Sequence, residues 1–318
     1  MSMFPLPFAP RRIVIGANAH QEIAAWIGSR RPDLEIRGAR MVDVTQADLE
    51  WAEAYVGFRR PPSASSLGKV RWVHCTGAGV DAWMSPEIDR GVLLTRTPES
   101  FGPAIAEWAV ARVLAFQQQL PEVMRAQSER RWEPREIRPV AGTRALLVGT
   151  GDVGSAIARQ FAALGIRVTG VSRTGRSEES AFAAVYPVDA LPHLVADADW
   201  IVLTLPITPA TRGLFSRDML SRCRGAVLLN AGRGPVVEEA VLPEALAAGW
   251  LRGAALDVFE VEPLPTDSPL WSHPRVLVSP HISGLTTSDG AGAGFLECLE
   301  GLEAGVLPRW VVDRVRGY

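Results

Sequence analysis

Short apolar runs alternate with helix-like stretches over the first hundred residues. The runs are only a few residues long and often end in Gly, as buried strands do, whereas residues 19–27 show helical spacing. A stretch rich in Pro, Ser and Gly, residues 61–68, predicts a loop. Strands are expected at 13–16, 34–36, 55–57 and 70–75. This alternation predicts a parallel sheet with helices on both faces.

A long apolar helix and a polar loop are expected next. Pro103 suits the first turn of a helix, and apolar residues from Ile105 to Phe116 recur at helical spacing. We therefore expect one helix from Pro103 to about Arg125. The polar stretch 131–139 contains two prolines and predicts a loop.

A second alternating series begins at Arg144. Its apolar runs predict strands separated by helical stretches, at 145–148, 167–171, 200–205, 226–230, 253–257 and 276–278. Regular alternation of this kind is typical of a doubly wound sheet. Because 318 residues are too many for one average domain, the pattern predicts an α/β protein with two domains.

Composition and charge exclude several classes of protein. The chain is 47% hydrophobic and 21% charged, and its net charge of −2 gives no indication of a nucleic-acid or anionic-membrane partner. The three cysteines are far apart and form no CxxC pair, which argues against disulfides and a metal site and favours a reducing, cytoplasmic setting. No run approaches the roughly 20 apolar residues of a membrane span, and the proline-containing first ten residues do not resemble a signal peptide.

A GxGxxG pattern lies between a predicted strand and a predicted helix. Gly149 allows a tight turn, Gly151 lets the backbone approach a pyrophosphate, and Gly154 lets the helix pack close to the strand. The helix start, with Asp152 and Val153, offers free amides and a partial positive charge to phosphates. The pattern predicts a dinucleotide site, and a glycine-rich turn without a ligand is the alternative.

The residues that end the second strand of this series indicate which dinucleotide binds. Enzymes that use NAD usually place an acidic residue there, but this chain has Ser172. Arg173 can pair with a 2′-phosphate, Ser172 and Thr174 add donors, and Arg176 could assist. The segment therefore predicts NADP(H). NAD(H) use, with Arg173 as an ordinary surface arginine, is the alternative.

Three later segments each place a reactive side chain after an apolar run. Arg233, Glu262 and His281 are all expected near the carboxyl ends of strands, where ligands of open α/β sheets bind. A histidine can donate a proton near neutral pH, and a carboxylate keeps the imidazolium charged and oriented. An arginine can bind a substrate carboxylate and polarise a carbonyl. The set suits the reduction of a 2-keto acid by a nicotinamide.

With these motifs in order along nearly the whole chain, the sequence resembles the D-isomer-specific 2-hydroxyacid dehydrogenases. The resemblance implies that Arg233 binds substrate, that Glu262 is the acid partner and that His281 is the general acid/base. It favours Glu262 over the neighbouring Glu260. It also implies a substrate loop at 76–81, whose backbone amides hold the substrate carboxylate through Ala78, Gly79 and Val80.

The resemblance extends to the cofactor contacts, the domains and the assembly. It implies that Asp257 contacts the nicotinamide amide and that a loop lies along the cofactor through Leu205, Pro206 and Thr211. It implies a flavodoxin-like substrate domain formed by residues 1–99 and 285–318 and a Rossmann cofactor domain formed by residues 100–284. It implies that residues 295–312 are the family's closing helix and tail. It also implies that the helix beginning at Pro103 forms part of a homodimer interface.

The Ser-Arg-Thr segment and the chain length are most similar to NADP-dependent glyoxylate/hydroxypyruvate reductases. The expected reaction is hydride transfer from NADPH to a small 2-keto acid. Phosphoglycerate is an alternative substrate, but it would call for extra basic residues near the substrate loop, and residues 77–89 contain none. A nucleotide-sensing corepressor on the same scaffold is the alternative from another class.

The remaining candidates are given structural roles. His20, His193 and His273 are expected to be structural, and so is His74 despite its place beside the substrate loop. On a strand, the side chain of Cys75 would point away from His74 and remain buried. Trp83 and Trp108 are expected in the core, although either could shape the substrate pocket.

Overall fold

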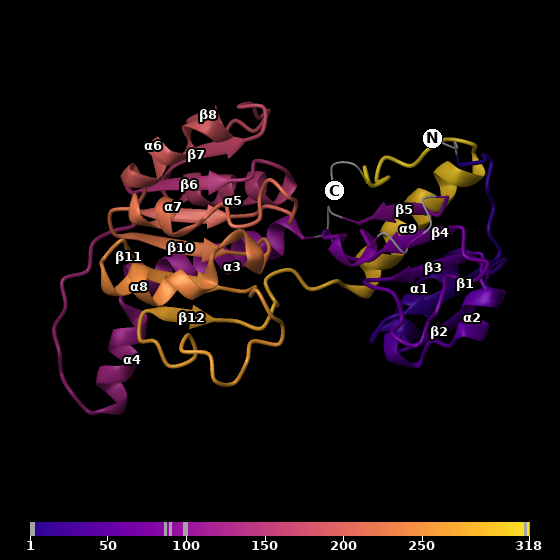
Figure 1. The fold of residues 1–318 in the computed structure, drawn as a ribbon, viewed down its shortest axis with the longest axis horizontal. Helices are drawn as coiled ribbons and strands as arrows, with labels where there is room; N and C mark the ends of the chain where they lie inside the picture. The colour runs from indigo at the N-terminus through magenta and orange to yellow at the C-terminus, as the bar shows by residue number, and fades with distance from the viewer. Residues whose placement is uncertain (1–3, 86–87, 89–90, 98–100, 315–316, 318) are drawn as a thin grey trace. The chain divides into compact units, whose positions relative to one another are not determined.

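The computed structural model describes residues 4–85, 88, 91–97, 101–314 and 317. The chain forms two compact units, shown in Figure 1. The first unit comprises Met1–Ser100 and Thr286–Tyr318, and the second comprises Phe101–Leu285. In the described residues no helix is both long enough and apolar enough to cross a membrane.

The first unit contains a parallel sheet whose described strands run in the order β2-β1-β3-β4-β5. This is the flavodoxin-like order. The strands are β1 (Arg12–Gly16), β2 (Glu35–Ala39), β3 (Ala54–Gly57), β4 (Trp72–Cys75) and β5 (Leu93–Arg96). The last of these was not predicted. It pairs on its free side with the chain end, where an antiparallel bridge joins Thr95 to Val311.

Helices cover both faces of this sheet. Ile13 and Ile15 pack with α1 and α9, whereas Val14 packs with α2, as the two-residue period of a strand requires. The helical segments of the unit are α1 (His20–Arg30), α2 (Gln46–Trp51), α9 (Ser288–Glu303) and the 3₁₀ turns Met41–Asp43 and Asp81–Trp83.

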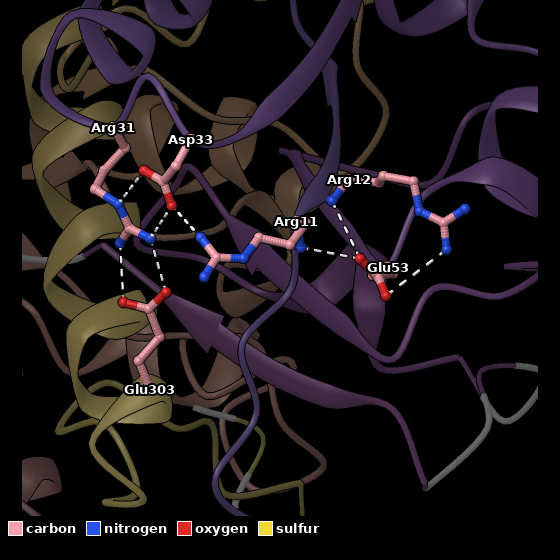
Figure 2. A network of polar contacts seen from close by, with 6 residues as sticks. All are labelled: Arg11, Arg12, Arg31, Asp33, Glu53 and Glu303. Carbon is pink, nitrogen blue, oxygen red and sulfur yellow. Dashed lines mark hydrogen bonds and ion pairs between the residues drawn. The ribbon is translucent and has the colours of Figure 1, made fainter.

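An ion-pair network fastens the end of α1 to the end of α9 (Figure 2). The Arg31 guanidinium donates to Glu303 at 2.7 and 2.9 Å and to Asp33 at 2.8 Å, and Arg11 also pairs with Asp33. These partners hold the pKa of Arg31 above and that of Asp33 below its ordinary range. The bidentate geometry fixes how the carboxyl-terminal helix lies against the amino-terminal strands of this unit.

The second unit contains a larger parallel sheet, with its described strands in the order β12-β11-β10-β9-β6-β7-β8. Counted from β6, this contains the Rossmann order 3-2-1-4-5-6 with one more strand at the far edge. The strands are β6 (Arg144–Val148), β7 (Arg167–Ser172), β8 (Ala184–Pro187), β9 (Trp200–Leu203), β10 (Ala226–Asn230), β11 (Leu251–Leu256) and β12 (Val276–Val278).

Alternate residues of these strands pack against two sets of helices. Leu146, Ile201 and Leu228 belong to a core shared with α7 and α8, while α3 packs against α5. The helical segments are α3 (Gly102–Gln117), α4 (Leu120–Ser128), α5 (Asp152–Ala163), α6 (Leu191–Leu194), α7 (Arg217–Ser221), α8 (Leu242–Ala247) and the 3₁₀ turns Val188–Ala190, Val195–Asp197, Gly234–Val236 and Glu239–Val241. The predicted fold class, two doubly wound α/β sheets, is confirmed.

The prediction of one helix from Pro103 to Arg125 was wrong. The helix α3 ends at Gln117, Gln119 is left-handed with φ of 50°, and α4 begins at Leu120. Pro121 explains the break, because its ring would clash with the carbonyl four residues before it and it has no N–H to donate. The loop predicted at 131–139 is confirmed, since that stretch has no helix or strand.

The closing helix begins earlier than expected. We expected it from Phe295, but α9 starts at Ser288, where the Thr287 hydroxyl caps it by accepting from the Gly290 amide at 3.0 Å. The first turns of α9 are rich in glycine, which usually argues against a helix. Here tertiary packing requires glycine. A Cβ on Gly292 would lie 2.3 Å from the Trp26 ring.

Candidate active site

The glycine turn between β6 and α5 has the shape that a pyrophosphate needs. Gly149 has φ of +108°, and a Cβ on Gly154 would lie only 2.0 Å from the Gly149 carbonyl oxygen. Gly151 faces open space, since a Cβ there would meet nothing within 4 Å. No side chain caps α5 at Gly151, so amides of its first turn, such as that of Val153, can serve a ligand. These residues fit a dinucleotide.

The end of β7 presents a cationic side chain and no carboxylate. The Ser172 hydroxyl accepts from the Arg176 amide at 3.2 Å and donates to the Arg176 carbonyl at 3.1 Å, which folds the segment into a turn. Arg173 and Thr174 are exposed at this turn. Among the described residues, Arg173 forms no hydrogen bond or ion pair, so its guanidinium is available to an anion.

The loop after β9 lies beside the glycine turn. A Cβ on Gly149 would lie 2.5 Å from the Thr204 hydroxyl, and one on Gly232 would lie 2.7 Å from the Leu205 carbonyl. The Thr211 hydroxyl donates to the Pro206 carbonyl at 2.7 Å and closes the loop. The segment that holds Leu205, Pro206 and Thr211 therefore connects the glycine turn to the turn after β10.

Arg233 follows β10 in a turn held by a buried asparagine. The Asn230 side chain donates to the Arg233 carbonyl and accepts from the Gly232 amide, both at 3.1 Å. Gly234 lets this turn lie directly against the Phe259 backbone, because a Cβ on Gly234 would lie 1.9 Å from the Phe259 carbonyl oxygen. Sequence reasoning did not assign a role to Asn230, although an Asn that ends a buried strand before a Gly is typical of such turns.

Glu262 and His281 form a hydrogen-bonded pair in the same unit. The Nδ1 atom of His281 lies 2.7 Å from Oε2 of Glu262, and Oε1 accepts from the Phe259 amide at 3.1 Å. Burial raises the pKa of Glu262, but the His281 hydrogen bond, the Phe259 amide and the positive charge of Arg233 outweigh it, so this pKa is lowered. The structure thus brings the three predicted residues together.

Glu260 has a different environment. Its Oε1 atom accepts from the Glu239 amide at 3.4 Å, and its own amide donates to Glu239 at 3.0 Å. The side chain is exposed and lies outside the pair formed with His281. The geometry therefore favours Glu262 as the partner of the histidine.

Asp257 is fully buried at the end of β11. Its carboxylate accepts from the Ile282 amide at 3.0 Å, the Ser283 amide at 2.8 Å and the Ser279 hydroxyl at 2.5 Å. Asp257 therefore anchors the segment that carries His281. Its contact with a nicotinamide amide stays a prediction.

The expected substrate loop, residues 76–81, lies in the first unit after β4. Thr76 is buried, and its carbonyl accepts from the Thr286 hydroxyl at 3.1 Å. Ala78 and Gly79 are half-buried, while Val80 is buried. Among the described residues, the backbone amides of these three donate no hydrogen bond, which leaves them available to an anion.

Not all of the residues given structural roles are buried: His20 and His273 are half-buried and His193 is exposed. His74 is fully buried, with Nδ1 2.9 Å from the Thr95 hydroxyl and Nε2 2.6 Å from the Thr97 hydroxyl, and burial lowers its pKa to about 3. Cys75 packs on the opposite face of the sheet, as predicted. Trp83 and Trp108 are also buried.

Comparison with known proteins identifies the family. A sequence profile described as D-isomer specific 2-hydroxyacid dehydrogenase, NAD binding domain, matches residues 110–283. The chain belongs to the D-isomer-specific 2-hydroxyacid dehydrogenase family. It is therefore an oxidoreductase with a nicotinamide-dinucleotide-binding domain, and the resemblance inferred from its motifs is confirmed.

Relatives of this dehydrogenase match it over nearly its whole length. The glyoxylate/hydroxypyruvate reductase A of Yersinia enterocolitica is 32% identical over 93% of this chain and 97% of the relative. A family member from Xanthobacter autotrophicus Py2, solved with NADPH and MES, is 33% identical, covers 98% of this chain and 100% of its own, and has a TM-score of 0.88. An NADPH-dependent glyoxylate/hydroxypyruvate reductase from Sinorhizobium meliloti, solved with NADP and sulfate, is 27% identical, with coverage of 96% and 99% and a TM-score of 0.86.

Proposed function

We propose that this dehydrogenase reduces a small 2-keto acid, of the glyoxylate or hydroxypyruvate kind, to the corresponding 2-hydroxy acid. The observation that carries the proposal is the hydrogen bond between Glu262 and His281 beside the charge of Arg233. The name of the Yersinia relative supports the substrate class. When bound, NADPH supplies the hydride that goes to the keto carbon, and the carbonyl oxygen takes up one proton.

In this proposal the three side chains have separate roles. Arg233 binds the substrate carboxylate and polarises the carbonyl as negative charge develops on its oxygen. His281 donates the proton to that oxygen from Nε2, because Nδ1 is held by Glu262. Glu262, whose pKa is lowered, stays ionised at neutral pH and orients the imidazole through its contact with Nδ1. The amides of Ala78, Gly79 and Val80 are proposed to bind the substrate carboxylate.

The same proposal assigns the cofactor contacts. The turn that contains Gly149, Gly151 and Gly154, with the α5 amides, would hold the pyrophosphate. The 2′-phosphate would be bound by the exposed Arg173, with Ser172, Thr174 and Arg176 adding donors. The nicotinamide amide would contact Asp257, and the cofactor would lie along Leu205, Pro206 and Thr211. NADP(H) is therefore the proposed cofactor, and NAD(H) the alternative.

We also infer a homodimer in the cytoplasm. The helix α4 and the loop after it carry exposed large apolar side chains, which are uncommon on a monomer surface: Leu120, Val123, Met124, Trp132 and Ile137. Trp132 is 96% exposed, and a second copy of this surface would cover it. The three buried cysteines, none of which forms a disulfide, support a reducing compartment.

One experiment tests the function directly. The purified protein is given NADPH or NADH with glyoxylate, hydroxypyruvate, pyruvate or a bulkier 2-keto acid, and loss of the reduced nicotinamide is followed by absorbance. We expect the highest kcat/KM with NADPH and glyoxylate or hydroxypyruvate. Tight binding of the nucleotide without oxidation by any keto acid would overturn the proposal and favour a nucleotide-sensing role.

A further inference from the structure

Backbone amides of the segment that carries His281 converge on Asp257. Three consecutive backbone amides donate to Asp257: that of His281 to its carbonyl oxygen at 2.8 Å, that of Ile282 to Oδ1 at 3.0 Å and that of Ser283 to Oδ2 at 2.8 Å. The position of the backbone at Ile282 and Ser283, directly after His281, therefore depends on the orientation of the Asp257 carboxylate.

The backbone at His281 is in an unusual conformation. Its φ is +54°, in the left-handed region, which a non-glycine residue adopts only when its surroundings hold it there. The conformation places Nδ1 against Glu262. If the Ile282 and Ser283 amides lost the Asp257 carboxylate as their acceptor, the backbone at His281 could relax and the contact of Nδ1 with Glu262 would weaken.

Two residues outside this turn orient the Asp257 carboxylate. The Ser279 hydroxyl donates to Oδ1 at 2.5 Å and accepts from Nε1 of Trp108 at 3.0 Å. A hydroxyl has one proton, so the indole N–H fixes the direction in which Ser279 donates. Arg112 lies over the Trp108 ring, 4.9 Å from its centre, and its charge also acts on Asp257.

We propose that Ser279 and Trp108 are positioning residues for His281. The chain from the Trp108 indole through the Ser279 hydroxyl to Asp257 holds the left-handed turn, and the turn holds the imidazole against Glu262. The helix α3, which carries Trp108, is thereby connected to the proton donor. This inference rests on the proposed function, in which His281 donates the proton.

The test removes each hydrogen bond with little change in shape. Ser279→Ala removes the hydroxyl, Ser279→Thr keeps it, and Trp108→Phe removes only the indole N–H and one ring. For each variant kcat, the KM of the keto acid and the pH at which kcat falls to half on the acid side are measured. Trp200→Phe is the matched control, because Trp200 is equally buried and donates to the Thr143 hydroxyl at 2.9 Å in the same unit.

We expect Ser279→Ala to lower kcat about tenfold, the effect of losing one hydrogen bond that fixes a reacting group. The midpoint of the acid side of the pH profile should move to higher pH, since Glu262 loses part of the His281 hydrogen bond that lowers its pKa. Ser279→Thr should restore both values, Trp108→Phe should move both in the same direction, and Trp200→Phe should leave both unchanged. If Ser279→Ala does not fold, Trp108→Phe carries the test.

Unchanged kcat and pH midpoint in Ser279→Ala and Trp108→Phe would overturn the inference, as would equal losses in Trp108→Phe and Trp200→Phe. A His281→Ala variant measured in parallel separates the two proposals. Full activity in that variant would refute the role of His281 itself. Loss of activity there, with normal Ser279 and Trp108 variants, would refute only the positioning role.

Discussion

The Nδ1 atom of His281 lies 2.7 Å from the Glu262 carboxylate, and this contact determines what the imidazole can do. One ring nitrogen is held by an ionised partner, so the other is the nitrogen that can exchange a proton with a substrate. Both side chains remain about one-third exposed, at 38% for His281 and 36% for Glu262, so a ligand can reach them.

Replacing Glu262 with Gln should lower kcat for keto-acid reduction by about 10- to 100-fold. Glu262 is ionised at neutral pH because its pKa is lowered, and Gln does not titrate, so a fall in kcat on the acid side that comes from protonation of Glu262 should be lost. The pH dependence of kcat measures both effects. Glu260→Gln is the control and should behave as the wild type, since Glu260 pairs with the Glu239 backbone instead. An unshifted profile in Glu262→Gln would refute the role of this carboxylate.

Replacing Arg233 with Ala should raise the KM of the keto acid by about tenfold or more and also lower kcat, because a charge-assisted contact with the carboxylate and carbonyl is lost. NADPH affinity should change little. Steady-state kinetics and nucleotide titration separate the two effects. Keto-acid kinetics equal to those of the wild type would show that Arg233 does not bind the substrate.

Replacing Arg173 with Ala should weaken NADPH binding by about tenfold and leave NADH binding nearly unchanged, since only NADPH carries the 2′-phosphate. Dissociation constants from fluorescence titration measure the difference. Arg167→Ala is a matched control, because Arg167 is an exposed arginine at the opposite end of β7. Equal losses for the two nucleotides would mean that Arg173 does not distinguish them.

The buried His74 should make the protein less stable in acid. Burial lowers its pKa to about 3 in the folded protein, against about 6.5 in an unfolded chain. Between these values the unfolded chain binds a proton that the folded one does not. The stabilisation of the folded protein by neutral His74 is therefore fully present above about pH 6.5. It is lost as pH falls below that value, by at most about 1.4 kcal/mol per pH unit.

Urea unfolding at pH 7 and pH 5 tests this. From pH 7 to pH 5 the free energy of unfolding of the wild type should fall by about 2 kcal/mol more than that of His74→Gln. The Gln amide can still bond the two threonine hydroxyls but does not titrate. His193→Gln, a change at an exposed histidine, should follow the wild type. An equal loss in wild type and His74→Gln would contradict the assignment.

Most of the strands that sequence alone predicted have continuous apolar runs, such as β6 and β10, which are buried on both faces. Two strands were missed: β5, although it is mostly buried, and β8, which is half-exposed and has no such run, so that only its pairing with β7 defines it. The break before α4 was readable from Pro121. The early start of α9 was not, because its glycines are explained by the packing of Trp26, far away in sequence.

The meeting of Arg233, Glu262 and His281 could be predicted because the carboxyl ends of parallel strands share one edge of a sheet. The connection from Trp108 to Ser279 could not, since these residues are 171 positions apart and their contact depends on where α3 packs. The three amides on Asp257 likewise depend on a left-handed turn at His281, and no local pattern indicates such a turn at a histidine.

Turnover of a His281→Ala variant with NADPH and glyoxylate or hydroxypyruvate tests the central claim most directly, with NADPH binding measured on the same sample. We expect kcat to fall by about 100-fold or more, while the NADPH dissociation constant stays within about twofold of the wild type. Turnover at the wild-type rate with NADPH bound normally would contradict it.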